Sequence, residues 1–164
     1  MNFSPTITTF KKIIIVFWAL WWLIALWTDI VGAFAQLGLL HASWAPNGNY
    51  PFLVESLQMY NVPSWVPAVL FVGILLWSTL SAASFTWAAC SLSQPQAVWM
   101  ERAHTAFIIT LTYWLAFFLA DQLVMKFDLE QNHMVQGGFQ LLSFMVLFIS
   151  ASSEESRPAV EQTS

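Results

Sequence analysis

The sequence predicts an all-α integral membrane protein, built as one bundle of four transmembrane helices. Composition is the first reason: 58% of the 164 residues are hydrophobic and 9% are charged, whereas a soluble domain has about 25% charged residues. The second reason is a set of long apolar runs, each near the roughly 20 residues that cross a bilayer. These runs also lack the alternation of membrane β-strands. The five Lys and Arg form no basic stripe, so nucleic acid is excluded as a partner.

The first helix is predicted over residues 13–40, directly after Lys11 and Lys12. Proline, asparagine and glycine in the segment 41–65 predict a connection. Within that connection, residues 50–60 have the composition of one or two turns of interfacial helix. The first half of the chain therefore contains one long span and an irregular link.

Three further helices are predicted over residues 66–90, 100–125 and 134–152. A tight turn at Gln94-Pro95-Gln96 separates the first two, and a short polar link precedes the last. Residues 1–152 thus form a single predicted domain. The polar segment 153–164 has the composition of a disordered tail.

Basic residues predict the orientation of the bundle. Lys11, Lys12, Arg102 and Arg157 fall on one side of the membrane in this layout, and Lys126 falls on the other. Because cytoplasmic segments carry the excess of Lys and Arg, both termini are predicted in the cytoplasm. We expect a multi-pass protein of an inner or plasma membrane.

A cleaved signal peptide is the alternative interpretation of the N-terminal region. The lysine pair, an apolar run and Ala33-Phe34-Ala35 follow the order of such a peptide. The apolar run is longer than the usual 7–15 residues, however, and it is rich in tryptophan. Asp29 also lies just before the potential cleavage site, so a transmembrane helix is the preferred interpretation.

Two acidic residues are predicted inside the membrane. At about 1.5 Å per residue, Asp29 lies roughly 24 Å along the first helix and Asp121 roughly 27 Å along the third. Both then lie at similar depth toward the outside, where a charge costs about 3 kcal/mol and should face protein or water. Spacing of seven residues places Asp29, Trp22 and Gln36 on one helix face.

These residues predict an outer-side site for a proton, a cation or a polar ligand. Its candidate members are Asp29, Gln36, Asp121, Lys126 and His133. An alternative stays open at this stage, in which the two acids are structural and the others are ordinary polar residues at helix ends.

The sequence contains two Glu-x-x-His motifs, at Glu101–His104 and Glu130–His133, which resemble the ligand motif of di-iron bundles. They fall at opposite ends of the third predicted helix, so one site cannot use both. A haem held by His41 and His133 would lie at the surface. Neither a metal nor a cofactor is therefore predicted, and no nucleophile motif indicates a catalytic residue.

Small residues predict where helices pack closely. Ser78, Ala82 and Thr86 are four residues apart on one face of the second helix, and Gly137 and Gly138 lie near the start of the fourth. Such faces let helix backbones approach in membranes.

Tryptophans predict contacts with the surroundings. The group Trp18, Trp21 and Trp22 covers more than one helix face, so part of it is expected to face lipid, a hydrophobic molecule or another protein. Trp44, Trp65 and Trp99 fall near predicted interfaces, as in an aromatic belt.

Four helices with Asp29 late in the first resemble, in outline, the sigma-2-receptor-like sterol-binding membrane proteins. Those proteins carry an acidic residue in the second helix, which has no counterpart in the charge-free stretch 66–90. No residue role is carried across from this resemblance.

Small size, absent catalytic spacing and aromatic faces favour a non-catalytic accessory subunit that docks on a larger membrane complex. Its predicted partners are the lipid bilayer and other membrane subunits. The first alternative is a carrier or binding protein for a proton, cation or hydrophobic ligand that uses Asp29 and Asp121. The second is a membrane enzyme that acts on lipid or quinone at the outer face.

Overall fold

A computed structural model describes residues 5–41 and 48–155, and this part of the chain is helical apart from its connections. The elements in order are α1 (Pro5–Gln36), α2 (Asn49–Leu57), the 3-10 turn η2 (Gln58–Tyr60), α3 (Trp65–Cys90), α4 (Gln96–Val124) and α5 (Phe127–Glu155). The predicted all-α class is confirmed for these residues. The short helix expected within residues 50–60 is present as α2.

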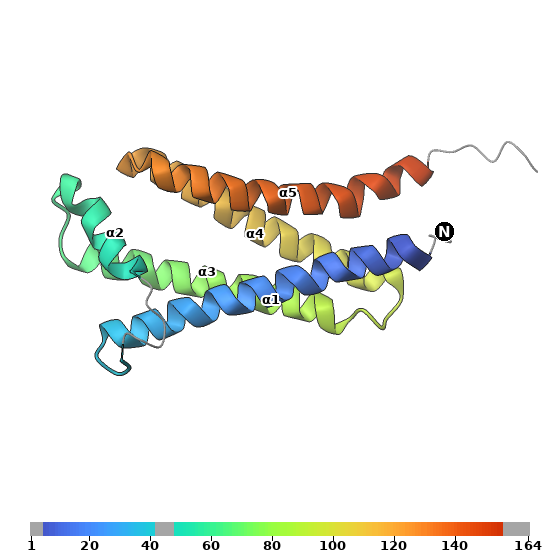
Figure 1. The fold of residues 1–164 in the computed structure, drawn as a ribbon, viewed down its shortest axis with the longest axis horizontal. Helices are drawn as coiled ribbons and strands as arrows, with labels where there is room; N and C mark the ends of the chain where they lie inside the picture. Colours follow the sequence, from blue (N-terminus) through green and yellow to red (C-terminus); the bar gives the residue numbers. More distant parts are fainter. Residues whose placement is uncertain (1–4, 42–47, 156–164) are drawn as a thin grey trace, which may run out of the picture.

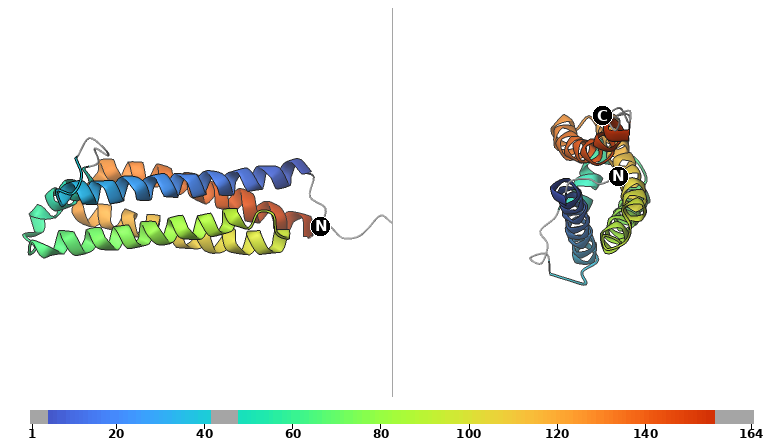
Figure 2. Two further views of the ribbon diagram at one scale, coloured as in Figure 1. Left: turned by 90° about the horizontal axis from the view of Figure 1, so that it is seen from below. Right: turned by 90° about the vertical axis from the view of Figure 1, so that its right-hand side faces the viewer.

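The four long helices run alternately in opposite directions (Figure 1). The start of α1, the α3–α4 connection and the end of α5 lie at one end of the molecule, which we call the basic end. At the opposite end, the capped end, α2 lies near the α4–α5 junction. Seen end-on, the helices follow an arc in the order α1, α3, α4, α5 (Figure 2).

Each helix in this arc packs against its neighbours, whereas α1 and α5 make few contacts with one another. The bundle is therefore open along one side, which we call the α1–α5 edge.

Three helices are long and apolar enough to cross a membrane, at Thr6–Gln36, Trp65–Cys90 and Gln96–Val124. Large apolar side chains are exposed on their outer faces, among them Leu76 and Leu119. Because a helix satisfies its own backbone hydrogen bonds, such faces are stable against lipid. The helices are thus consistent with a membrane protein.

The first helix begins at Pro5 rather than at residue 13 and ends at Gln36 rather than at residue 40. Its end is set by Gly38, which has a φ of +72°. This left-handed conformation is readily adopted by glycine. It lets the Leu39 amide donate to the Phe34 carbonyl at 2.9 Å, and such a bond closes the last turn of a helix.

The fourth long helix begins at Phe127 rather than at residue 134. Only Met125 and Lys126 separate it from α4, and Met125 has a φ of +53°. The polar residues predicted as a link therefore form the first turns of α5. Residues 153–155 of the predicted tail continue the helix, and the rest of the tail lies outside the described residues.

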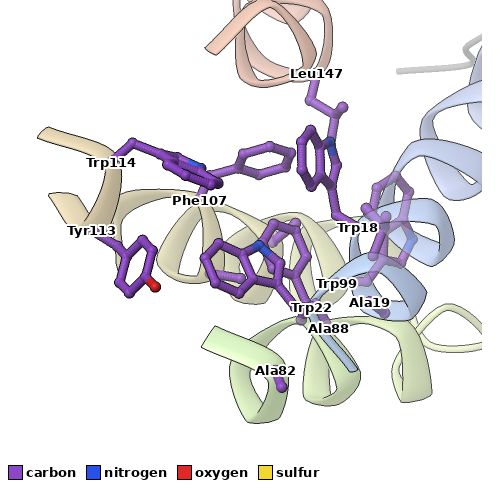
Figure 3. Close-up of a cluster of buried hydrophobic side chains, with 14 residues drawn as sticks. Trp18, Ala19, Trp22, Ala82, Ala88, Trp99, Phe107, Tyr113, Trp114 and Leu147 are labelled. Carbon is purple, nitrogen blue, oxygen red and sulfur yellow. The ribbon is translucent and has the colours of Figure 1, made fainter. Parts of the chain in front are cut away.

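Aromatic side chains fill the centre of the bundle (Figure 3). Trp18 and Trp22 of α1 are buried against Phe85 of α3 and against Tyr113 and Trp114 of α4. Part of the group Trp18, Trp21 and Trp22 was expected to face outward; Trp18 and Trp22 face the core, and Trp21 is half-buried. Aromatic rings bury a large area each, which makes this layer a major source of helix–helix contact.

Two expectations about tryptophans at the membrane interface have different outcomes. Trp99 is only 1% exposed and belongs to the core, whereas Trp65 is 63% exposed at the start of α3. Trp44 lies outside the described residues.

Candidate functional site

Asp29 of α1 is hydrogen-bonded to α2 and α3, and through α3 it is linked to α4. It is 7% exposed, and its Oδ1 accepts a hydrogen bond of 2.8 Å from the Asn49 side-chain amide at the start of α2. Its Oδ2 accepts from the Ser78 hydroxyl of α3 at 3.4 Å. The Ser78 hydroxyl lies 3.5 Å from the Tyr113 hydroxyl of α4. One carboxyl thus links α1 to α2 and, through Ser78, to α4.

Asp121 forms a second polar group, at the contact between α4 and α5. Its Oδ2 lies 2.5 Å from Nδ1 of His133, and Asp121 is 4% exposed. The His133 ring packs against Phe117 and Trp114, with ring centroids 4.8 and 5.9 Å away. Aromatic rings on the same helix as the carboxyl therefore help to hold the imidazole in place.

The other two predicted members of the site contact neither carboxyl side chain. The Lys126 ammonium lies 5.2 Å from the centre of the Phe52 ring, in cation–π geometry. Its backbone amide donates to the backbone carbonyl of Asp121 at 3.1 Å, and this hydrogen bond is part of the C-terminal end of α4. Gln36 is exposed and lines a cavity between α1, α2 and α3.

The two carboxyls, for which similar depth was predicted, have different hydrogen-bond partners in the structure. Asp29 is linked to α4 at the level of Tyr113, and Asp121 follows Tyr113 by eight residues. At 1.5 Å per residue the backbone positions of Tyr113 and Asp121 are about 12 Å apart along α4. In the described part of the chain their hydrogen-bond partners differ, so they belong to two polar groups. A role in binding a ligand or moving a proton stays a prediction.

The small residues predicted for helix packing have unequal surroundings. Ser78 and Ala82 are buried, while Thr86 is half-buried. A Cβ atom added to Gly137 would lie 2.9 Å from Phe118 Cζ and 3.0 Å from Trp114 Cβ. A Cβ atom added to Gly138 would meet nothing within 4 Å. Gly137 is therefore the glycine that lets α5 approach α4.

Gln140 is a buried polar residue that the sequence analysis did not single out. Its Oε1 accepts a hydrogen bond of 2.6 Å from the Trp114 indole. Within the described residues, the Gln140 side-chain nitrogen and the indole nitrogens of Trp18 and Trp22 are buried without a hydrogen-bond partner. The signal that could have found this cluster is a glutamine inside an otherwise apolar run.

Basic side chains hold the opposite end of the bundle together. The Lys12 ammonium donates to the Leu92 carbonyl at 2.7 Å, which ties α1 to the α3–α4 connection. The Arg102 guanidinium lies 4.4 Å from the centre of the Trp87 ring. This end therefore carries the residues on which the predicted orientation depends.

Among the described residues, no group of three or more His, Cys, Asp or Glu side chains is arranged to hold a metal ion. Comparison with protein-family models finds no matching family. Comparisons with curated proteins and with solved structures find no significant match either.

Proposed function

We propose that the chain is a small non-catalytic integral membrane protein that docks as an accessory subunit on a larger membrane complex. In this proposal it forms a four-helix bundle in an inner or plasma membrane, with both termini in the cytoplasm. The stretch from Met134 to Ser152 of α5 has no charged residue, which supports a fourth span beside α1, α3 and α4. The basic residues at the end where α1 begins support the orientation.

The observation that carries this proposal is the α1–α5 edge. Phe17 and Phe139 are about half exposed there, and their rings meet at 5.9 Å. Phe139 also packs on Trp18, at 5.7 Å. The indole nitrogen of Trp18, which has no hydrogen-bond partner among the described residues, therefore lies one side chain behind the edge.

A buried donor at this place favours a protein partner over lipid. An unsatisfied polar group costs up to several kcal/mol in an apolar medium. Acyl chains offer no hydrogen-bond acceptor, whereas a helix of another subunit offers hydroxyl, amide and backbone oxygens. A partner helix that displaces the Phe139 ring gives the Trp18 indole nitrogen the acceptor it lacks.

Site-specific photocrosslinking in native membranes tests the proposal. A benzophenone amino acid at Phe139 or Phe17 is expected to give one discrete protein adduct. The matched control is Leu76, which is 67% exposed on the outer face of α3 and is expected to give lipid adducts alone. Lipid adducts alone at Phe139 and Phe17, or the same protein adducts from all three positions, would contradict a docking edge.

The Asp121–His133 pair supports a second candidate, a proton- or cation-binding membrane protein. A carboxylate oxygen and an imidazole nitrogen 2.5 Å apart can share one proton between them, because each can accept a hydrogen bond and each can carry the proton. Proteoliposomes under an imposed membrane potential should then show proton uptake that Asp121→Asn abolishes. Glu130→Gln is the matched control, since Glu130 contacts Gln122 instead. Equal uptake by wild type and Asp121→Asn excludes this function for the pair.

A further inference from the structure

A cavity of about 580 Å³ opens at the capped end, between the end of α1, the α2–η2 segment and the start of α3. Its volume falls within the range of small-molecule sites, roughly 300–1,000 Å³. Its lining includes neither Asp29, Asp121 nor His133. The cavity is therefore separate from both polar groups and from the α1–α5 edge.

The lining has one formal charge, the carboxylate of Glu55, and no Lys, Arg or His. Within the described residues, nothing pairs with the Glu55 side chain, which is exposed. Gln36, Gln58 and Asn61, which are polar and neutral, also line the cavity. The Tyr50 ring, which packs edge-to-face on Phe71, adds an aromatic wall, and Val54 adds an aliphatic one.

We propose that this cavity binds a small organic cation, a protonated amine with an apolar body. The unpaired Glu55 carboxylate supplies the counter-charge, and a charge-assisted hydrogen bond to it is stronger than a neutral one. The Tyr50 ring attracts cations electrostatically, and the amide groups orient the ligand. Lys126, whose ammonium lies over the Phe52 ring, is not part of the lining, and no ion pair joins it to Glu55 among the described residues.

Other ligand classes fit these residues less well. A calcium ion needs six to eight oxygen ligands, and one carboxylate in a wide cavity with apolar walls does not provide them. An anion would meet the negative charge of Glu55 directly. A neutral sugar would use the amides but would leave the carboxylate without a partner.

Two probes that differ in one group test the charge requirement. Phenethylamine is cationic at pH 7.5, and 2-phenylethanol has the same ring and chain but is neutral. Titration calorimetry of the purified chain in nanodiscs is expected to show saturable binding of the amine only. Glu55→Gln should weaken this binding at least about tenfold, which is typical for losing a hydrogen bond to a charged group. Glu101→Gln, an exposed position in the second turn of α4, should leave it unchanged.

A second variant separates the cavity from the charge alone. Gln58→Trp keeps Glu55 but fills the opening, and it should remove saturable binding while the circular dichroism spectrum and the melting temperature stay as in wild type. Three outcomes would overturn the proposal: equal binding of the two probes, unchanged affinity in Glu55→Gln, or no saturable binding of the amine to wild type. The photocrosslinking result at Phe139 is independent of all three, so the docking proposal can fail separately.

Discussion

His133 and Asp121 face each other across the contact between α5 and α4, with Nδ1 2.5 Å from Oδ2. The turn at Met125 and Lys126 makes this possible, because it reverses the chain between two residues that are twelve apart in sequence. The α1–α5 edge is open, so α5 depends mainly on α4 for its position. The pair therefore fixes the first turns of a helix that has few other neighbours.

Removing either partner of this pair should destabilise the fold. We expect His133→Ala and Asp121→Ala each to lower the free energy of unfolding by about 1–3 kcal/mol, because the remaining group loses its hydrogen bond. The double variant should cost less than the sum of the two single variants, as is usual for residues in contact. Unfolding in detergent by titration with sodium dodecyl sulfate, followed by circular dichroism, measures these values.

The neighbouring pair of Gln122 and Glu130 provides the control. Their side chains meet at 2.6 Å but are exposed to solvent. Since water replaces such contacts readily, Gln122→Ala should cost less than about 1 kcal/mol. If the loss of unfolding free energy in the Asp121 and His133 double variant equals the sum of the losses in the two single variants, the buried pair contributes no coupling energy.

The two adjacent glycines of α5 should respond in opposite ways to alanine. Gly137→Ala places a methyl group against Phe118 and Trp114, and overpacking of this kind costs about 1–3 kcal/mol. Gly138→Ala meets open space and should stabilise by up to about 1 kcal/mol, because alanine favours the helix. Melting temperatures of the two variants measure the difference. Equal shifts would mean that α5 is rotated relative to α4.

The same glycines show how far the sequence predicts the fold. Two consecutive small residues in an apolar run indicate close helix packing, and this much is visible without a structure. Which of them faces α4 depends on how α5 is turned about its axis, and the sequence analysis started this helix at residue 134 instead of Phe127. Hydropathy marks where lipid begins, whereas helices extend past that boundary wherever backbone hydrogen bonds can continue. The residues at which the helices begin and end are therefore less predictable from the sequence than the number of its apolar runs.

The candidate site was predictable in part, for a related reason. A charge inside an apolar run is easily recognised, so Asp29 and Asp121 could be selected from the sequence. Their partners follow from tertiary structure: Asn49 comes from a connection, and Ser78 was selected only as a small residue for packing. Counting residues from the predicted helix starts also placed both acids at one depth. It takes no account of how α1 and α4 are shifted along the bundle, so it could not show that Asp29 reaches α4 through Ser78 at Tyr113 and not at Asp121.

Cysteine labelling tests the proposed orientation. In a Cys90→Ala background, cysteine at Gln131 or Asn61 should react with an impermeant thiol reagent on intact cells. Cysteine at Gln94 should react only after the membrane is permeabilised. All three positions are exposed in the structure, so access to the side chain itself is equal. Labelling of Gln94→Cys on intact cells would reverse the orientation and place the Glu55 cavity in the cytoplasm.

Two buried serines on α3 should show opposite effects when their hydroxyl groups are removed. Ser78→Ala takes away the 3.4 Å hydrogen bond to Asp29, so a buried carboxylate oxygen loses a donor and the protein should lose about 1–2 kcal/mol of stability. The Ser81 hydroxyl is buried without a hydrogen-bond partner among the described residues. Ser81→Ala therefore removes a desolvated polar group at little packing cost and should stabilise by about 1 kcal/mol. Both changes delete one oxygen atom from the same helix, so differences in helix propensity and volume cancel in the comparison.

The measurement is the unfolding free energy in detergent, repeated in an Asp29→Leu background. If the Ser78 effect comes from the carboxylate, it should shrink there while the Ser81 effect stays the same. A Ser78 effect that persists without Asp29 would assign it to Tyr113 or to packing, and the hydrogen bond from Ser78 to Asp29, which links α3 to α1, would then contribute nothing to stability.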